Sequence, residues 1–360
     1  MLQKHMIFRG AMLGMAVGDA MGYTVDRASL AQIRDDYGPN GLLGYDMANG
    51  RAEVSSNTQV AAFAANGLLL GLTRGQTDKL VNYVGLALKE WSRSQQFSDP
   101  ARNYCWLSGV PELKRRRCLD TCMLDALSRG LGTLEEPRYR SDSPTNLTTV
   151  IPLALLSGNL GMTQEELDRM GARMVVLTHG EPEAFLSGAV LTHAMSALLR
   201  QPDMGLDALL QETVNAVQLQ FGRSFHQTTG IWELLQYART LASSPYIAPA
   251  DAMEQLGCRT APEVLAGVLY ACATCGGDFD TAMITAVNHS GRSAAVGAIT
   301  GAVLGMQQGA QALPEFYLEC LEPAHPLIEL ADDLTRGCPA DVMSRLFDDD
   351  WDRKYIRCDM

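Results

Sequence analysis

Four short segments carry the polar residues whose types and spacing could support chemistry. They are residues 18–22 (GDAMG), 55–59 (SSNTQ), 178–182 (THGEP) and 288–297 (NHSGRSAAVG). Carboxylate, amide and hydroxyl oxygens bind hard cations, and histidine and arginine side chains can hold anions or protons. We therefore take as candidates for a ligand-binding cleft Asp19, Asn57, Thr58, His179, Asn288, His289 and Arg292.

Two of these candidates also have an ordinary structural interpretation. His179 stands beside Gly180 at an expected helix end, which is typical of a capping or core histidine. His289 precedes a glycine-rich helical segment, and we leave open whether it is a loop residue or a cleft residue.

The elements that must position these segments are helices. Thr163 with Glu166, and Thr260 with Glu263, have the spacing of capping boxes. Apolar residues recur with a helical period over segments 59–73, 79–92, 204–221, 229–242 and 327–336. Alternating strand-like runs are nearly absent, no repeat of 30–45 residues is visible, and we find no Pro-, Gly- or Ser-rich linker. The sequence therefore predicts one compact all-α domain.

Two glycine stripes predict an unusually close contact between helices. Glycines recur every fourth residue, so that each set lies on one helix face; the sets are Gly14, Gly18, Gly22 and Gly297, Gly301, Gly305. Glycine inside a helix costs about 1 kcal/mol relative to alanine, so three in succession need a compensating reason. Close helix–helix approach supplies one. We leave open whether the same two helices also assemble a site between them.

Composition excludes several classes of function. The 360-residue chain has a net charge of −12 and a pI near 5.0, which disfavours a nucleic-acid partner. No apolar run approaches the ~20 residues of a membrane span. Nine cysteines are scattered, and the lone CxxC pair, Cys272 and Cys275, has no second pair to complete a zinc site. We expect reduced thiols and a cytoplasmic location.

In their order and spacing, the four segments resemble the ADP-ribosylglycohydrolase family, the relatives of dinitrogenase-reductase-activating glycohydrolase. The resemblance runs from about residue 7 to about residue 340 and includes the stretch 276–280 (GGDFD). It implies an all-α, single-domain, orthogonal helical bundle over residues 1–360, with a tail from about residue 341 to 360. It also implies a hydrolase that holds two divalent cations, usually magnesium, in a central cleft and removes ADP-ribose from arginine, serine or related acceptors.

The sequence departs from this family at the positions that would bind the metals. The family motifs resemble Ser/Thr-Asp-Asp-Thr and Asn-His-x-Gly-Asp-Ser-Asp-Ser/Thr-Thr-Gly. Where those motifs have aspartate, this chain has Ser56, Asn57, Arg292 and Ala294. Magnesium needs several oxygen ligands, typically carboxylates, and a cation facing Arg292 would be repelled. We therefore expect no metal at these degenerate positions and no cofactor. We expect Arg292 to point into the cleft and to pair with Asp19, Asp26 or a bound anion.

Other family features have changed as well. A Gly-rich loop of the family corresponds here to residues 141–152, which lack its glycines, and a second loop corresponds to residues 116–122. Asp26 stands near the place of a family glutamate and would be catalytic only in an active protein. We interpret the basic run 114–117 (KRRR) as a solvated helix face, with phosphate or acidic-protein binding as the alternative. A catalytic thiolate at Cys118 or Cys122 is another alternative.

Together these observations favour a catalytically impaired ADP-ribosylglycohydrolase-like protein, a pseudoenzyme. Its expected role is to bind ADP-ribose, a related nucleotide or a protein partner through the former active-site cleft, without a nucleic-acid or membrane partner. The alternative is an active ADP-ribosyl hydrolase with a rebuilt site.

Overall fold

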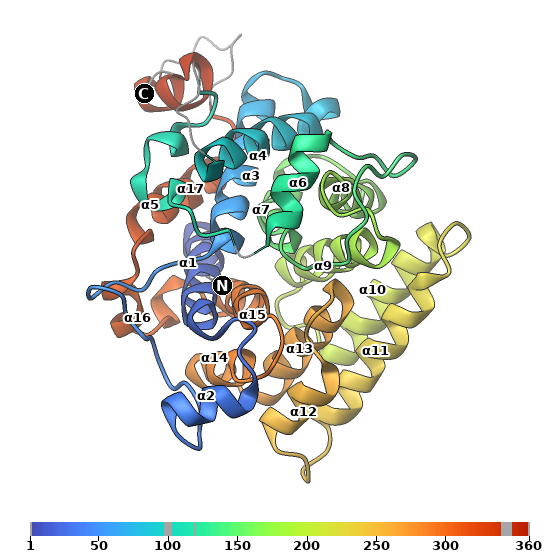
Figure 1. The fold of residues 1–360 in the computed structure, drawn as a ribbon. Coiled ribbons are helices and arrows are strands. Elements are labelled where there is room, and N and C mark those ends of the chain that lie inside the picture. Colours follow the sequence, from blue (N-terminus) through green and yellow to red (C-terminus); the bar gives the residue numbers. More distant parts are fainter. Residues whose placement is uncertain (1, 97–102, 119, 340–347, 359–360) are drawn as a thin grey trace.

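The computed structural model is an assembly of helices around a central pair (Figure 1). It describes residues 2–96, 103–118, 120–339 and 348–358. Within those ranges the non-helical pairing amounts to two isolated β-bridges, Ala48 with Arg51 and Ala52 with Leu321. The predicted all-α class is therefore confirmed. None of the helices in the described ranges has both the length and the apolar character needed to cross a bilayer.

The helices follow one another along the whole chain. The α-helices are α1 Lys4–Val25, α2 Leu30–Tyr37, α3 Ser56–Thr73, α4 Leu80–Gln96, α5 Pro111–Lys114, α6 Thr121–Arg129, α7 Ile151–Leu156, α8 Gln164–Val176, α9 Pro182–Arg200, α10 Leu206–Phe221, α11 Gln227–Ala242, α12 Pro249–Leu256, α13 Ala261–Thr274, α14 Phe279–Val287, α15 Ser293–Gln308, α16 Glu315–Cys320, α17 Ala324–Arg336 and α18 Asp349–Trp351. Short 3₁₀ turns are η1 Thr77–Lys79, η2 Trp106–Gly109, η3 Leu147–Val150, η4 Ser157–Asn159 and η5 Ala310–Ala312, and η6 Asp352–Arg357 is a π-helix.

The helices α1 and α15 form the central pair, and the glycine stripes lie between them. An ideal Cβ on Gly14 would stand 2.1 Å from the carbonyl oxygen of Gly301. One on Gly18 would stand 1.9 Å from that of Gly297, far inside contact distance. The close approach predicted from the spacing is therefore confirmed. Only glycine at these positions lets the two backbones touch.

Other helices surround this pair and build the hydrophobic core (Figure 1). Helix α3 is buried along almost its whole length and packs against α4, while α8 packs against α9. Helix α13 contacts α11, α14 and α15. The predicted caps form: Glu166 accepts a hydrogen bond from the Thr163 amide at 2.8 Å, and Glu263 accepts one from the Thr260 amide at 3.1 Å. The helical segments expected from periodicity correspond to α3, α4, α10, α11 and α17, although the expected segments 79–92 and 204–221 begin one and two residues before α4 and α10.

The basic run 114–117 is solvated only in part: Arg115 and Arg116 are exposed, but the run does not form one helix face and its last residue is buried. Helix α5 ends at Lys114, and Arg117 is buried, 6% exposed, in ion pairs with Glu53 at 2.8 Å and with Glu322. Arg115 reaches Glu322 at 2.8 Å. Because these carboxylates come from segments distant in the sequence, the run fastens its loop to the α16–α17 region.

Candidate functional site

A single buried carboxylate, Asp19 on α1, organises the start of α3. Its Oδ2 accepts hydrogen bonds from the amides of Ser55 and Thr58, at 2.9 and 3.0 Å, and from Thr58 Oγ1 at 2.6 Å. Its Oδ1 accepts from Ser55 Oγ at 2.5 Å and from Asn57 Nδ2 at 3.3 Å. Burial raises the pKa of Asp19, and the hydrogen bonds from Ser55 and Thr58 oppose that rise. Five donors occupy both oxygens, so Asp19 fastens α3 to α1.

Asn57 and Ser56 stand where a metal-binding motif would have aspartates. The Asn57 side chain is fully buried, and its Nδ2 also donates to Ser55 Oγ at 3.1 Å. Its Oδ1 has no hydrogen-bond partner in the structure. The backbone amide of Ser56 donates to the carbonyl of Arg117 at 3.0 Å. One buried acceptor, Asn57 Oδ1, therefore remains for a ligand or a water molecule.

Arg292 caps α15 and is the centre of a second group of charges. Its Nε lies 3.4 Å from Asp26 Oδ2, and its Nη1 lies 3.3 Å from Asp120 Oδ2 and 3.4 Å from Ser143 Oγ. Arg27 lies 3.7 Å from the same Asp26 oxygen and 3.4 Å from Asp120. We call Asp26, Arg27, Asp120, Ser143 and Arg292 the Arg292 cluster. The predicted ion pair with Asp26 is present, whereas Asp19 is no partner of Arg292.

Sequence reasoning missed three members of this cluster as site residues, Arg27, Asp120 and Ser143, of which Asp120 makes the most contacts. It caps α6, and it accepts hydrogen bonds from the Cys122 amide at 3.0 Å and from Ser143 Oγ at 2.9 Å. Partial burial by itself raises the pKa of Asp120, but these hydrogen bonds and Arg292 outweigh burial and bring the pKa to about 2. An aspartate directly before a short amphipathic helix was the available signal, because aspartate is a preferred N-cap residue.

The Arg292 cluster is electrically balanced but not fully hydrogen-bonded. Arg292 is 7% exposed and the Asp26 side chain is 2% exposed. Burial raises the pKa of Asp26, and the positive charge of Arg292 opposes that rise. The facing atoms, Arg292 Nε and Asp26 Oδ2, lie at ion-pair distance without hydrogen-bond alignment, and Arg292 Nη2 has no partner. Two arginines and two aspartates thus leave buried guanidinium donors unused.

The three remaining candidates use their polar atoms on the protein itself. Asn288 donates to the carbonyls of Leu42 and Ile284 and accepts from the Leu42 amide at 2.7 Å. His289 accepts from the Gly291 amide at Nδ1 and donates from Nε2 to the Ala286 carbonyl, both at 3.0 Å. Asn288 and His289 therefore hold their loop and are not supported as ligand-binding residues.

His179 lies in the core beside a cysteine. Its Nδ1 is 2.9 Å from Thr178 Oγ1, and its Nε2 is 3.1 Å from Thr145 Oγ1 and 3.3 Å from Cys122 Sγ. The ring is completely buried, which agrees with the core interpretation. Burial lowers the pKa of His179 to about 4 and raises that of Cys122 to about 12.

Acidification should destabilise the protein through two of its buried histidines, His179 and His289. Burial lowers the pKa of His289, like that of His179, to about 4. The unfolded chain therefore binds protons first as the pH falls below about 6.5, and stability is lost between that pH and about 4. We expect each ring to remove about 2 kcal/mol from the free energy of unfolding between pH 7 and pH 5. Urea denaturation at both pH values measures this loss.

A matched pair of variants separates this effect from general acid sensitivity. His179→Gln removes a buried ring and should shrink the loss between the two pH values, whatever its effect at pH 7. His226→Gln changes an exposed ring and should leave the loss as it is. Equal losses in both variants would contradict the assignment.

The residues present do not fit a magnesium pair. The Asp19 oxygens are occupied by five donors, and a guanidinium lies between Asp26 and Asp120. Within the described ranges, no three His, Cys, Asp or Glu side chains gather as metal ligands. Divalent cations need several free oxygen ligands and are repelled by a fixed positive charge. Among the described residues, the positions that the family motifs give to metal ligands therefore offer a poor donor set for a magnesium pair.

Comparison with known proteins identifies the fold. The sequence model of the ADP-ribosylglycohydrolase family matches residues 3–341. Among solved structures, one titled "ADP-ribosylglycohydrolase-related protein complex" superposes with a TM-score of 0.58 at 23% sequence identity, covering 92% of this chain and 98% of that chain. A search of curated proteins returned no match. Because the family model spans nearly the whole described helical assembly, this chain belongs to the ADP-ribosylglycohydrolase family.

Proposed function

We propose that this protein is a catalytically inactive ADP-ribosylglycohydrolase-family member that binds ADP-ribose or a related nucleotide at the Arg292 cluster. The observation that carries the proposal is the position of Arg292, whose guanidinium lies within ion-pair distance of both Asp26 and Asp120. A tethered positive charge thus takes the place that the family motif gives to a metal-binding carboxylate. Such a group is permanently charged and cannot activate a water molecule as a bound cation does.

The surrounding groups do not supply a substitute for the metals. Hydrolysis of a glycosidic bond needs a base within hydrogen-bond reach of the attacking water. Asp26 is the best placed carboxylate, but its Oδ1 accepts from the Ala294 amide at 3.1 Å and its Oδ2 faces Arg292. Asp19 is occupied by five donors. Asp19 therefore has no acceptor left for a water molecule, and Asp26 Oδ2, although it accepts no hydrogen bond, is buried against the Arg292 guanidinium.

One observation favours the alternative of a rebuilt active site, namely the thiol–imidazole contact between Cys122 and His179 at 3.3 Å. A nucleophilic cysteine needs a thiolate, usually stabilised by a histidine cation. Here burial moves the two pKa values apart, to about 12 for Cys122 and about 4 for His179, so both groups are neutral at pH 7. The contact therefore supports a packed neutral pair more than an activated nucleophile.

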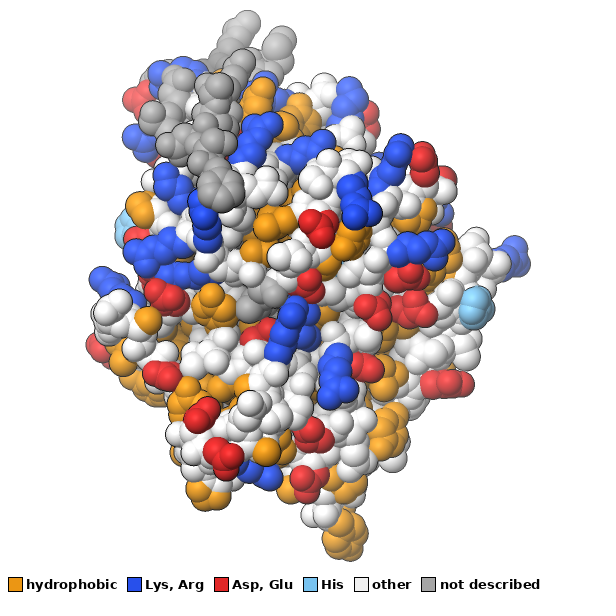
Figure 2. All heavy atoms as spheres, in the orientation of Figure 1, with side chains coloured by type: hydrophobic (Ala, Val, Ile, Leu, Met, Phe, Trp, Pro, Cys, Tyr) orange, Lys and Arg blue, Asp and Glu red, His pale blue; other side chains and the backbone are white. Residues whose placement is uncertain are grey.

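The unused donors explain why a nucleotide is the favoured ligand. Arg292 Nη2 has no partner, and Arg27, whose side chain is half exposed, lies on the same two carboxylates. Guanidinium groups bind phosphates through paired hydrogen bonds. Asn57 Oδ1 is a buried acceptor without a partner that suits a ribose hydroxyl. On the face of the molecule shown in Figure 2, acidic and basic side chains are interspersed, which is unfavourable for a nucleic-acid strand.

We expect the purified protein with magnesium to bind ADP-ribose in isothermal titration calorimetry. We also expect it to release no ADP-ribose from ADP-ribosylarginine or ADP-ribosylserine peptides. An intact family member serves as the positive control for the release assay, and Arg292→Lys, which keeps the charge but loses the paired donors, should weaken binding about tenfold. Magnesium-dependent release that disappears in Asp26→Asn would show an active enzyme. If no nucleotide bound, the proposed nucleotide-binding role would be wrong, and binding of a protein partner through the former active-site cleft would be the remaining role.

A further inference from the structure

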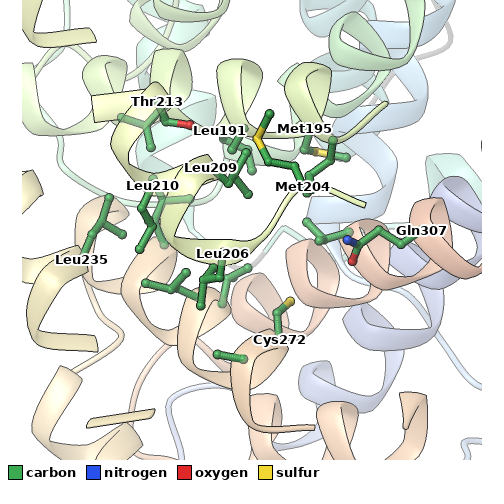
Figure 3. Close-up of a pocket in the computed structure, with 18 residues that line it drawn as sticks. Leu191, Met195, Met204, Leu206, Leu209, Leu210, Thr213, Leu235, Cys272 and Gln307 are labelled. Atoms are coloured by element: carbon green, nitrogen blue, oxygen red, sulfur yellow. The ribbon is translucent and has the colours of Figure 1, made fainter. Parts of the chain in front are cut away.

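A cavity lies beside the C-terminal part of α15, whereas the Arg292 cluster lies at the start of that helix. Five helices enclose it: α9, α10, α11, α13 and α15 (Figure 3). Its volume is about 220 Å³. Arg292 stands at the start of α15 and Gln307, which lines the cavity, near its end. The two residues are fifteen positions apart, which corresponds to about 22 Å along the helix axis. The cavity is thus a separate place from the proposed nucleotide site.

The lining of this cavity is almost entirely apolar and carries no charged side chain. Leucine, valine and methionine dominate it, with Leu191, Met195 and Leu209 among the labelled residues in Figure 3. Moving a charge into such surroundings is very costly, whereas apolar surface gains about 25 cal/mol per Å² removed from water. A ligand of this cavity must therefore be neutral and largely apolar.

One buried polar atom stands out in this lining, the hydroxyl of Thr213. The residue is 2% exposed, and its Oγ1 has no hydrogen-bond partner in the structure. A threonine within a helix ordinarily donates to the carbonyl four residues earlier, as Thr192 does to Gly188 at 2.8 Å. Thr213 makes no such bond although it lies inside α10. An unsatisfied buried hydroxyl costs free energy that a ligand hydrogen bond would recover.

The two ends of the cavity differ in their access to water. Thr213 lies at a buried end, with Leu209 and Leu210 beside it on α10. Gln307 is only half buried and Ala273 is exposed, and both also line the cavity. Figure 3 places Thr213 and Gln307 at opposite sides of it. A ligand can therefore enter near Gln307 with its polar group oriented toward Thr213.

We propose that this cavity binds a neutral, apolar small molecule with a single hydroxyl or carbonyl group, which pairs with Thr213. A dry engineered cavity of about 150 Å³ holds benzene, so the larger volume here suits roughly ten non-hydrogen atoms. An aromatic alcohol or a medium-chain alcohol has this size and chemistry. The inference rests on the lining and on Thr213, and it does not depend on the proposed nucleotide site.

Three naphthalene compounds test this chemistry directly with the full-length protein. 2-Naphthol is neutral at pH 7 and carries one hydroxyl, naphthalene lacks the hydroxyl, and 2-naphthalenesulfonate carries a charge. We expect naphthol fluorescence to report saturable binding at one site per chain, naphthalene to bind several-fold more weakly, and the sulfonate not to bind. Equal binding of the sulfonate, or no binding of either neutral compound, would overturn the proposal.

Variants of the lining show where the ligand binds. Thr213→Val keeps the shape and removes the hydroxyl, so 2-naphthol should bind about three- to tenfold more weakly while naphthalene is unaffected. Thr240→Val, at an exposed threonine of α11, is the matched control and should change neither affinity. Ala194→Phe, on α9, should fill the cavity and abolish binding of both compounds. Unchanged 2-naphthol affinity in Thr213→Val would exclude the assigned contact, even if Ala194→Phe did not fold.

Discussion

Replacing Gly18 with alanine is expected to destabilise the protein by about 3 kcal/mol or more, because the added methyl group has no room. Its Cβ would stand 1.9 Å from the carbonyl oxygen and 2.3 Å from the carbonyl carbon of Gly297. Both atoms belong to the backbone of α15, so rotation of a side chain cannot relieve the contact. Helices α1 and α15 would have to separate along the whole glycine stripe. The free energy of unfolding from urea denaturation measures the effect.

A second helical glycine provides the control for this prediction. Gly230 lies inside α11, is exposed, and an added Cβ there would meet nothing within 4 Å. Gly230→Ala should therefore stabilise the protein by about 0.5–1 kcal/mol through helix propensity alone. If Gly18→Ala behaved like Gly230→Ala, the two helices would not be in the contact described for them.

Replacing Arg292 with alanine should cost about 3–5 kcal/mol of stability, the usual effect of leaving one partner of a buried ion pair uncompensated. The charge left behind is Asp26, whose side chain is 2% exposed. Arg27→Gln is the matched control, because Arg27 lies against the same two aspartates with a half-exposed side chain. An exposed pair is worth about 1 kcal/mol or less. Thermal and urea unfolding of both variants give the comparison.

The pH dependence of Arg292→Ala supplies a sharper criterion. Burial already raises the pKa of Asp26, and loss of the Arg292 charge, which opposes that rise, must raise it further. The folded variant then takes up a proton more readily than the unfolded chain, so its deficit relative to the parent should shrink as the pH falls from 7.5 to 5.5. Adding Asp26→Asn to Arg292→Ala should recover part of the stability at pH 7.5. If the loss of unfolding free energy in Arg292→Ala were the same at both pH values, Asp26 would not be the carboxylate left without a partner.

We also expect chelators to have no effect on the thermal stability of the parent protein. If Arg292 holds α1, α6 and α15 together in place of metal ions, EDTA and added magnesium should both leave the melting temperature unchanged. A melting temperature that falls with EDTA and recovers with magnesium would mean that a cation, and not the guanidinium, stabilises this region.

Local features of the fold were readable from the sequence, because they depend on neighbours within one or two helical turns. The capping pair Thr163–Glu166 and the apolar periods predict helices at α8, α3 and α17 without any knowledge of what these helices touch. The glycine stripes also predict a contact between two helices that are distant in the sequence. Glycines four residues apart must share a face, and a face without side chains is useful only against another smooth surface, here that of α15 against α1.

The identity of buried partners was decided only by the tertiary structure. From the sequence, several aspartates are possible ion-pair partners for Arg292. The fold pairs Arg292 with Asp26 and with Asp120, which lies 172 positions away in the sequence. Asp19 carries the same chemistry but is occupied by the start of α3. Arg117 looks like part of a solvated basic run, yet the fold buries it against Glu322. In each case the charged side chain could form an ion pair with several residues of opposite charge. Only the placement of helices that are distant in the sequence determines which pair forms.

The cavity between α9, α10, α11, α13 and α15 makes the same distinction for apolar residues. Periodicity predicts that Leu209 and Thr213 lie on one face of a helix, because they are four residues apart. Whether that face meets another helix closely or leaves a space depends on the volumes of side chains from four other segments. The sequence determines which residues share a face, and the packing of the assembled helices determines what that face encloses.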